Sequence, residues 1–401
     1  MFFDQGGRHY SFAKYLKGDG YNPVVFCSNT RHGEDGTFYD NSVLFSVKRE
    51  KNIGVPFVFV KGIPYQGNKN GRILNFVDFY NNVKRAAKIY AKRHGKPDIL
   101  YASSVHPLTL AAGIELAKYF KVKCICEIRD LWPESLVAYG ILKKKSLFTR
   151  ALYYGEQWIY RKADSLVFTM EGGKDYIKEK GWDERIDLSK VHHINNGVDL
   201  DAFNLNKRKH QITDKDLEDP SIFKAVYVGS IRMVNDLDAL LNVAKKVDDP
   251  KIRFLIWGNG DAIEKLRNRI KDEHIDNVVL KGRAEKYCIP YILTQTDVCL
   301  MHGKTSDIMK YGMSLNKSFE YLASGKPIIT TIGGKYDYIT GNNAGFFVEY
   351  DNEKNYAELI SKIKNMSKEE YHAICTNAIN ASEKYDFKIL TKKLEMIIEE
   401  L

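Results

Sequence analysis

Lys317 and Glu320 are the two side chains of this sequence whose types and spacing best suit the binding of a ligand. We expect residues 316–324 to form a short helix that ends at Gly325, followed by a buried strand over residues 328–331. Residues three apart share a helix face, so the lysine and the free N–H groups of the first turn would favour an anion, while the carboxylate accepts bonds from vicinal hydroxyls. A diphosphate joined to a ribose fits this pair. The alternative is a surface ion pair, which would contribute a few tenths of a kcal/mol.

The elements that must position this pair belong to a long alternation of strand-like and helix-like segments. One series of strands is expected between residues 24 and 195 and another between residues 225 and 331, which is typical of parallel sheets with crossover helices. A chain of 401 residues is also too long for one core. We therefore predict an α/β fold with domains at residues 1–204 and 205–382 and a final amphipathic helix within residues 383–401. Ligands should bind beyond the carboxyl ends of the strands.

Six phrases of this sequence together resemble those of one known family. They are GGRHY at residues 6–10, SSVHP at 103–107, EIRDLWPES at 127–135, NNGVD at 195–199, GNGD at 258–261 and the block at 314–331. In their order and spacing the chain resembles the retaining glycosyltransferases of family 4, in the branch that builds bacterial O-antigen and capsule polysaccharides, and it is similar to fucosaminyltransferase-type enzymes. The resemblance implies the GT-B fold, with two facing Rossmann-like domains for acceptor and donor and a C-terminal helix that crosses back to the first domain.

The same resemblance implies transfer of a sugar, with retention, from a nucleotide sugar to a lipid-linked or saccharide acceptor in cell-surface polysaccharide synthesis. A UDP-sugar is the favoured donor, and a polyprenyl-diphosphate-linked sugar is one expected acceptor. No cofactor is expected, and the Asp-Leu-Asp segments at 199–201 and 236–238 are not convincing metal sites. Two other functions stay open: a sugar-nucleotide epimerase on the same fold, and a catalytically impaired binding subunit of an envelope assembly complex.

The donor-side candidates follow strands of the second domain. Gly258 and Gly260 form a glycine loop between a strand and a helix, which could present N–H groups to a phosphate or a sugar. The family commonly has an arginine and, five residues later, a lysine after the preceding strand, whereas this sequence has Ser230 and Asn235 there. Arg232 and the lysine of the helical pair are therefore the expected cations on the donor diphosphate.

Another departure concerns the two glutamates, eight positions apart, that are usual in the family. The corresponding positions here are Glu320 and Gly312. Only the ribose-binding member is present, so the backbone amides of Gly312, Met313 and Ser314 are expected to hold the sugar ring. Arg283, at a strand end, is expected to flank the nucleobase. No residue is an obvious covalent nucleophile, which makes a front-face mechanism the default expectation.

Asp130 is the candidate for the acceptor side of the reaction. It follows an apolar strand over residues 124–128, and a turn containing Trp132 follows it. Burial would raise the pKa of the carboxyl towards neutrality, so that it could accept the proton of an acceptor hydroxyl or orient that hydroxyl. The alternative is that Asp130 caps the next helix. Arg129 and Glu134 are expected to support it rather than to react.

His106 and a glycine pair complete the candidates of the first domain. His106 follows a predicted strand, where a neutral imidazole could bond a sugar hydroxyl or the diphosphate, although isolated histidines are usually structural. Gly6 and Gly7 allow the backbone to approach an anion at a helix start, although two glycines are a turn in most proteins. Arg8 and His9 are expected to face the same space.

The net charge of +10 lies entirely in the first half of the chain, where residues 1–200 hold 31 basic and 21 acidic residues. Two segments, 72–96 and 143–162, combine basic with aromatic residues. Such segments bind an anionic membrane surface, which we favour, or form a solvated helix face, and no nucleic-acid motif supports a role on DNA or RNA. The sequence has no apolar run of 18 residues and no signal peptide, so we expect a cytoplasmic protein, peripheral on the inner face of the plasma membrane.

Two further features concern folding. The six cysteines are expected to be free thiols, because Cys124 and Cys126 alternate on an apolar strand and no C-x-x-C pair occurs. The family usually opens with an apolar strand before its glycine loop, but only five residues precede Gly6. We therefore expect the first strand to be missing, and either the assigned start is an internal methionine, which we favour, or the edge of the first sheet is built differently, since an absent central strand would leave backbone groups unpaired.

Overall fold

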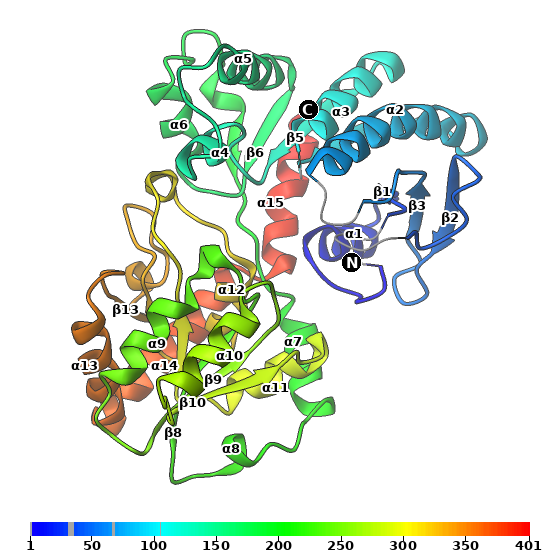
Figure 1. Ribbon diagram of the computed structural model, residues 1–401. Helices are drawn as coiled ribbons and strands as arrows, with labels where there is room; N and C mark the ends of the chain where they lie inside the picture. The colour runs from blue at the N-terminus through cyan, green and yellow to red at the C-terminus, as the bar shows by residue number, and fades with distance from the viewer. Residues whose placement is uncertain (1, 31–35, 66–68, 105) are drawn as a thin grey trace. The chain divides into compact units, whose positions relative to one another are not determined.

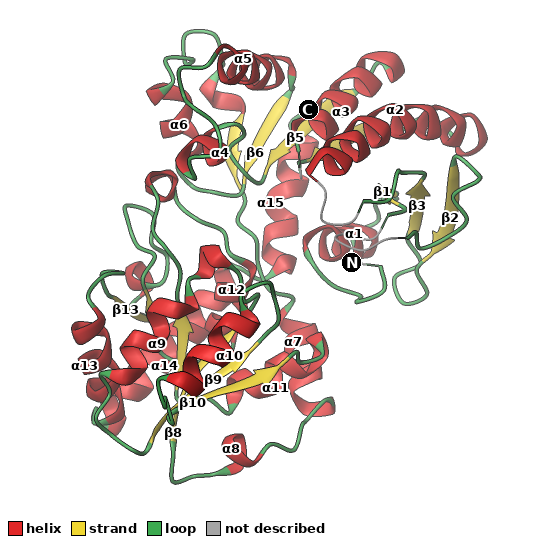
Figure 2. Ribbon diagram, viewed as in Figure 1, coloured by secondary structure: helices red, strands yellow, loops and turns green. Residues whose placement is uncertain are grey.

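The computed structural model describes nearly all of the chain (Figure 1). The described residues are 2–30, 36–65, 69–104 and 106–401. Helices and strands alternate along them, as the sequence predicts (Figure 2). Within these residues, none of the helices combines the length and the apolar character that a membrane crossing requires. All six cysteines are free thiols, as predicted.

The chain divides into two compact units. Unit 1 comprises Met1–Asn195 and Leu390–Leu401, and unit 2 comprises Asn196–Ile389. The boundary that we placed between residues 204 and 205 falls inside a helix of unit 2, α7 (Leu200–Lys209). The first residues of that helix are fixed locally, since the Asp199 carboxylate accepts a hydrogen bond from the backbone N–H of the third residue after it.

Unit 1 contains two sheets. One has the order β1–β3–β2, in which β2 runs antiparallel to β3, and the other has the order β4–β5–β6–β7, in which all strands are parallel. The strands are β1 (Val25–Ser28), β2 (Phe45–Arg49), β3 (Pro56–Val60), β4 (Ile99–Ser103), β5 (Lys123–Ile128), β6 (Ser165–Phe168) and β7 (Val191–His193). In the described residues β1 and β4 are edge strands, so no continuous sheet crosses unit 1.

The helices of unit 1 cover these sheets. They are α1 (Arg8–Gly18), α2 (Lys69–His94), α3 (Pro107–Phe120), α4 (Glu134–Ala138), α5 (Leu147–Lys162) and α6 (Gly173–Glu179), with a short 3₁₀ turn, η1 (Leu188–Lys190). Val58 and Val60 of β3 pack with Phe79 and Val83 of α2 and with Ala112 of α3 in one buried cluster. Helices α2 and α3 therefore join the first sheet to the second, since α3 packs on β4 and β5.

The last helix of the chain, α15 (Phe387–Glu399), begins in unit 2 and ends in unit 1. Its second half packs on the region after α1, where Lys392 forms an ion pair with Asp19 at 3.2 Å and the Tyr21 hydroxyl donates to Glu399 at 3.2 Å. The helix thus crosses back to the first domain, as the resemblance implied.

Unit 2 is built on one parallel sheet of six strands in the order β10–β9–β8–β11–β12–β13. The strands are β8 (Phe223–Val228), β9 (Ile252–Trp257), β10 (Val278–Gly282), β11 (Val298–Met301), β12 (Ile328–Thr330) and β13 (Gly345–Phe347). Successive residues of β8 belong to different cores, since Ala225 and Tyr227 pack on one face while Val226 and Val228 pack on the other. The sheet is therefore buried on both sides, which is typical of Rossmann-like units.

The helices of unit 2 lie on these two faces. They are α7, α8 (Lys215–Glu218), α9 (Leu237–Lys245), α10 (Ile263–Asp272), α11 (Ile289–Thr294), α12 (Asn316–Ala323), α13 (Glu353–Lys364) and α14 (Lys368–Lys384), with 3₁₀ turns η2 (Met233–Asn235), η3 (Lys286–Cys288), η4 (Asp307–Tyr311) and η5 (Thr340–Asn342). Strand order reverses at β8, whose neighbours are β9 on one side and β11 on the other. The carboxyl ends of β8 and β11 thus form the topological switch point at which such sheets bind ligands.

Candidate functional site

Helix α12 forms where the sequence predicts it and carries the predicted pair of side chains to the switch point of unit 2. Gly325 ends the helix with a left-handed backbone, φ +67°, and β12 begins three residues later. Tyr321 of α12 contacts the last residue of β8: its hydroxyl accepts a bond from the Val228 backbone N–H at 2.8 Å and donates to the Val228 carbonyl at 3.1 Å. These bonds fix α12 to the carboxyl end of β8.

Lys317 is half-buried and its ammonium lies against a ring instead of a carboxylate. Its Nζ is 3.3 Å from the Tyr227 hydroxyl, to which it donates, and 4.4 Å from the centroid of that ring. Burial lowers the pKa of Lys317 to about 8. No ion pair joins Lys317 to any carboxylate in the described part of the chain. Its positive charge is therefore available to an anion.

Glu320 lies one helical turn further along α12. Burial raises the pKa of its carboxyl, against a smaller effect of Lys286. Among the described residues the Glu320 side chain has neither a hydrogen bond nor an ion pair, so the alternative of a surface pair with Lys317 is wrong. A half-buried lysine and a half-buried carboxylate, each without an ionic partner, are an arrangement that a protein stabilises poorly without a ligand.

The loop after β8 carries Arg232, which was predicted to contact the donor diphosphate. Arg232 is exposed, and its guanidinium has no partner in the described residues. The loop is held by other groups: the Tyr227 hydroxyl donates to the Ser230 carbonyl at 2.9 Å, and the Asn235 amide donates to the Ser230 carbonyl at 2.7 Å and to its hydroxyl at 3.0 Å. Asn235 therefore fixes the shape of the loop at the position where the family commonly has a lysine.

Gly258 and Gly260 prove to be packing residues. We predicted that their N–H groups would be free to bind a phosphate. Instead, the N–H of Gly258 donates to the Gly282 carbonyl at 2.8 Å and that of Gly260 donates to the Asn259 side chain at 2.9 Å. A Cβ on Gly258 would lie 1.9 Å from the Gly229 carbonyl oxygen, and one on Gly260 would lie 2.1 Å from that of Ile231. Both glycines are required because the backbones of two loops touch here.

The segment before α12 was expected to hold a sugar through three backbone amides. That prediction is wrong for Gly312, whose N–H donates to the Met309 carbonyl at 2.9 Å and whose φ is +90°. The side chain of Ser314 is also engaged, since its hydroxyl accepts from the Asn196 N–H at 2.6 Å and its carbonyl accepts from the Asn196 amide at 2.7 Å. The roles of the Met313 and Ser314 amides stay predictions.

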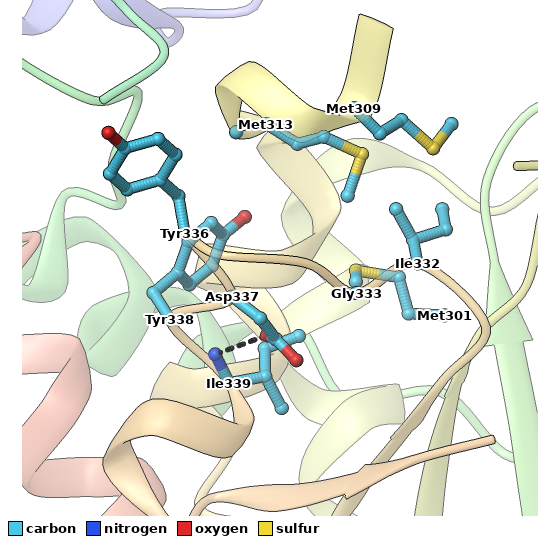
Figure 3. Close-up of a pocket in the computed structure, with 10 residues that line it drawn as sticks. Met301, Met309, Met313, Ile332, Gly333, Tyr336, Asp337, Tyr338 and Ile339 are labelled. Atoms are coloured by element: carbon cyan, nitrogen blue, oxygen red, sulfur yellow. Dashed lines mark hydrogen bonds between the residues drawn. The ribbon is translucent and has the colours of Figure 1, made fainter. Parts of the chain in front are cut away.

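Gly312 and Met313 also line a small pocket in unit 2 (Figure 3). Its other walls are formed by Met301, Met309, Ile332, Gly333, Tyr336, Asp337, Tyr338 and Ile339. The Asp337 carboxylate binds back to its own loop, where it accepts a hydrogen bond from the Ile339 N–H at 2.9 Å. The lining is therefore mostly apolar and aromatic. Arg283, predicted at the nucleobase, is exposed after β10 and has neither a hydrogen bond nor an ion pair with a described residue.

His302 is a residue at this site that the sequence reasoning missed. It follows β11 at the switch point, is completely buried, and has a pKa lowered to about 4 by that burial. Its Nε2 lies 3.1 Å from the Asp236 carbonyl, to which it donates, and its Nδ1 has no hydrogen-bond partner among the described residues. Tyr350 in turn donates to the Asp236 carboxylate. His302 could have been identified from the sequence, because it follows a predicted strand, which is the criterion that we applied to His106.

In unit 1, Asp130 follows β5 as predicted. It is exposed, yet the surrounding protein partly desolvates its carboxyl and raises the pKa, while Arg129 lowers it. The N-cap position of the next helix, α4, is Pro133 and not Asp130, so the alternative of a capping role is wrong. Glu134 is fully engaged, because it accepts a bond from Tyr153 at 2.5 Å and pairs with Lys180.

His106 is nearly buried at the start of α3. Its ring stacks on Phe76 with centroids 3.9 Å apart, and Arg72 lies on the Phe76 ring at 5.4 Å. Burial and then the charge of Arg72 lower the pKa of His106 to about 4, so the ring is neutral at pH 7. The Nδ1 atom has no hydrogen-bond partner in the described part of the chain, and Nε2 lies 3.4 Å from the Thr109 hydroxyl. Substrate contact by His106 stays a prediction.

Arg8, by contrast, is a structural residue. Its Nε donates to Glu127 at 2.5 Å, and its terminal nitrogens donate to the carbonyls of Ile194 and Asn195. Both Arg8 and Glu127 are buried, and His9 lies 3.5 Å from the same carboxylate. The expectation that Arg8 faces a ligand is therefore wrong. Arg8 joins the start of α1 to the carboxyl end of β5 and to the segment that follows β7.

Within unit 1 the predicted glycine loop and catalytic loop do come together. Gly7 is the N-cap of α1, with φ +91°, and Gly6 precedes it. The α1 start is joined to β5 through the Arg8 pair, and the Ser104 hydroxyl accepts the Arg129 N–H at 3.0 Å. The loops after β4 and β5 thus lie beside the start of α1, at the carboxyl edge of the second sheet.

Comparison with known proteins gives matches in both units. A model described as Glycosyltransferase Family 4 matches residues 8–202, and one described as Glycosyl transferases group 1 matches residues 208–381. The sequence is 24% identical over 233 residues to "Probable glycosyltransferase WbjE" of Pseudomonas aeruginosa, and 28% identical over 211 residues to TuaH of Bacillus subtilis, an inferred teichuronic acid biosynthesis glycosyltransferase. These alignments cover 57% and 52% of this chain and 56% and 50% of the relatives, so the chain spans about half the length of the curated relatives it matches.

Solved structures share the fold. HepE of Anabaena in complex with UDP aligns over 99% of this chain and 97% of its own, with a TM-score of 0.66 and 14% sequence identity. Such a low identity is evidence for the fold alone. The fold is GT-B, with two α/β units that contain parallel sheets, as predicted.

Proposed function

We propose that the chain is a glycosyltransferase that transfers a sugar from a UDP-sugar to an acceptor hydroxyl, on the premise of its matches to the models of Glycosyltransferase Family 4 over residues 8–202 and of Glycosyl transferases group 1 over residues 208–381. The observation that carries the proposal is the pair on α12. Lys317 and Glu320 lie at the switch point of unit 2 without ionic partners among the described residues, one suited to a diphosphate and the other to a ribose. HepE, which shares the fold, was solved with UDP bound.

In the proposed reaction, the bond between the anomeric carbon and the diphosphate oxygen breaks while the acceptor oxygen bonds to the same carbon. Lys317 and Arg232 would stabilise the negative charge that develops on the departing diphosphate, and Glu320 would hold the ribose hydroxyls. Asp130, whose pKa is raised by desolvation, would accept the acceptor proton or orient the hydroxyl. We infer retention through departure and attack on one face of the sugar, without a metal ion.

The acceptor is proposed to be a lipid-linked saccharide in cell-surface polysaccharide synthesis. The support comes from the name of TuaH, which refers to teichuronic acid biosynthesis, and from the basic first half of the chain, which suits a reaction at an anionic membrane. The enzyme would therefore act as a peripheral protein at the inner face of the plasma membrane.

Calorimetric titration with UDP and a radiolabelled transfer assay test the proposal. We expect Lys317→Met to weaken UDP binding by about tenfold to a hundredfold, since a charge-assisted contact is worth about 1.5–3 kcal/mol. We expect Asp130→Asn to leave UDP binding unchanged and to slow transfer by about 10² to 10⁴. Lys354→Met, at an exposed lysine of α13, is the matched control and should change neither value.

A catalytically impaired binding subunit is the second candidate. It is favoured by the replacement of two family cations by Ser230 and Asn235 and of a glutamate by Gly312. Tight UDP binding without transfer to membrane lipid extract, for any of a panel of UDP- and GDP-sugars, would support it. Conversion of a free nucleotide sugar to its epimer without any acceptor would instead identify an epimerase.

A further inference from the structure

Helix α5 has two apolar faces where a helix at a protein surface normally has one. Its inward face is buried and includes Thr149, Glu156, Ile159 and Tyr160. The Glu156 carboxylate fixes this face, because it accepts bonds from Tyr160 at 2.7 Å and from Tyr176 of α6 at 2.8 Å. The inward face therefore accounts for the packing of α5 on unit 1.

The outward face carries a second stripe, Leu147, Ala151, Tyr154 and Trp158, at the spacing of one side of a helix. Leu147 is 82% exposed and Tyr154 is 70% exposed. Trp158 is partly exposed, and a Cβ added to the neighbouring Gly155 would meet no atom within 4 Å. In the described part of the chain Leu147 and Tyr154 are thus largely uncovered, and Trp158 is covered in part.

Further exposed apolar groups extend the stripe at the start of the helix. Phe148 is 63% exposed, and Ile141 in the preceding turn is 64% exposed. Large apolar side chains that gather on one surface, rather than scatter singly, indicate an interaction site.

The exposed charges of the segment that carries the stripe have one sign. Residues 143–162 contain six basic side chains, and the single acidic residue of the segment, Glu156, is buried on the inward face. The basic residues are Lys143, Lys144, Lys145, Arg150, Arg161 and Lys162. None of the six forms an ion pair with a described carboxylate. The surface is thus apolar in the middle and positively charged at its edges.

We propose that this outward face of α5, together with residues 141–148, is the surface by which the protein docks on an anionic lipid bilayer. Leucine and phenylalanine would insert below the headgroups, tyrosine and tryptophan would lie at the interface, and the lysines would contact lipid phosphates. The inference rests on the proposed function insofar as the acceptor is lipid-linked. It commits to a bilayer because an apolar stripe that lies among the exposed cations of its own segment complements anionic headgroups over acyl chains.

The surface is α5 and not α2, whose basic cluster was equally prominent in the sequence. On α2 the cations are partly used within the protein: Lys84 pairs with Glu115 at 2.8 Å and lies 3.5 Å above the Tyr80 ring, and Lys88 lies 4.1 Å above the Tyr119 ring. On α5 no cation has an ion pair or a ring contact of this kind with a described residue.

The docking surface is linked to the predicted catalytic loop. The Tyr153 hydroxyl of α5 donates to Glu134 at 2.5 Å, and Glu134 begins α4 four residues after Asp130. Docking through α5 would therefore hold the Asp130 loop close to the membrane, where a lipid-linked acceptor lies.

Flotation of the full chain with vesicles of phosphatidylcholine, with and without phosphatidylglycerol, tests the inference. We expect binding only to the anionic vesicles. A triple variant, Leu147→Ser with Phe148→Ser and Tyr154→Ser, should reduce that binding by more than about tenfold at any salt concentration. A charge variant, Lys143→Gln with Lys144→Gln and Lys145→Gln, should reduce it by about tenfold or more at low salt and little at high salt.

The chain offers matched controls for both variants. Lys207, Arg208 and Lys209, three consecutive basic residues of α7, changed together to glutamine, should leave vesicle binding unchanged. So should Ile73→Ser with Leu74→Ser and Val77→Ser, three exposed apolar residues of α2. UDP titration and circular dichroism confirm folding of each variant, because none of these positions belongs to the donor site.

Three outcomes would overturn the inference: no binding of the wild-type chain to anionic vesicles, loss of binding in the α2 variant with the α5 variant unaffected, or a wild-type dimer that the α5 variant converts to monomers without a change in vesicle binding. The last would show that the stripe joins two copies of the chain. Vesicle binding needs no donor, so its failure leaves UDP binding intact. Failure of the proposed function appears instead as lost UDP binding or lost transfer while docking persists.

Discussion

Lys317 owes its chemistry to its surroundings as much as to its position on α12. Burial beside the Tyr227 ring lowers its pKa to about 8, so the ammonium is present below that pH and is lost above it. Binding of an anion by this ammonium is therefore lost as the pH rises through its pKa. Binding that depends on an ionised carboxylate would instead be lost as the pH falls.

We therefore predict that kcat/KM for the donor falls above a pH of about 8, the pKa of Lys317 in the free enzyme. Lys317→Arg should retain a cation and move this fall to higher pH, because guanidinium stays protonated. The measurement is a kcat/KM profile for both proteins between neutral and alkaline pH. An unchanged profile in the arginine variant would show that another group titrates.

The sequence predicted the helix that carries Lys317 and Glu320 correctly, because a helix of eight residues closed by Gly325 is decided by neighbouring residues. It misplaced Arg8, since the partners of that guanidinium, Glu127 and the Ile194 carbonyl, lie more than a hundred residues away. Side-chain type predicts what a group can bind, whereas burial depends on contacts that a single sequence does not display.

At the scale of elements, the parallel strands other than β13 were predictable because they are short apolar runs that pack within a sheet, whereas Gly345–Phe347 is a three-residue edge strand that is only partly buried. β2 was not among the predicted strands, since Phe45–Arg49 is an exposed, antiparallel strand at a sheet edge with a mixed sequence. The loops between strands were the least predictable. Gly258 and Gly260 were expected to face a phosphate, and they instead admit the backbone of the neighbouring loop.

This packing gives a prediction for the loops of unit 2. Gly258→Ala would place a Cβ 1.9 Å from the Gly229 carbonyl oxygen, so the loop after β8 must move, and with it Arg232. We expect the free energy of unfolding to fall by about 1–3 kcal/mol and UDP binding to weaken as well. Urea unfolding and calorimetric titration measure the two effects.

Gly341→Ala is the matched control for this change, because a Cβ there meets no atom within 4 Å and the residue lies in the same unit. It should alter the free energy of unfolding by less than about 0.5 kcal/mol. Equal effects of the two substitutions would contradict the packing role, and a loss of UDP binding without a loss of stability would restore the phosphate role of Gly258.

At the scale of the whole molecule, the chain consists of two units with separate cores, and different physical devices hold each of them together. Unit 2 rests on a continuous six-stranded sheet with a core on each face. Unit 1 rests on two sheets and, between distant segments, on the buried pair of Arg8 and Glu127. The organisation into two α/β units was predictable from alternating patterns and length. The division of unit 1 into two sheets could not be predicted, because the hydrophobic patterns do not show which strands pair with one another.

The buried pair gives the last prediction. Burial by itself would raise the pKa of Glu127, but Arg8 and His9 hold it well below its usual range, so the carboxylate is charged inside the protein. Arg8→Met removes the main partner and leaves that charge uncompensated, which costs about 3–5 kcal/mol. We expect unit 1 to unfold more readily while UDP binding by unit 2 persists, as measured by hydrogen exchange of peptides from each unit and by calorimetric titration.

Two companion variants decide whether the unpaired charge is the cause. Adding Glu127→Gln to Arg8→Met should recover part of the loss, because the double variant buries no net charge, and the difference gives the coupling between the two residues. Lys123→Met breaks an exposed pair with Asp164 in the same unit and should cost less than about 1 kcal/mol. If the double variant is as unstable as the single one, the ion pair is not the main cause of the stabilisation. Arg8 then stabilises unit 1 mainly through its hydrogen bonds to the Ile194 and Asn195 carbonyls.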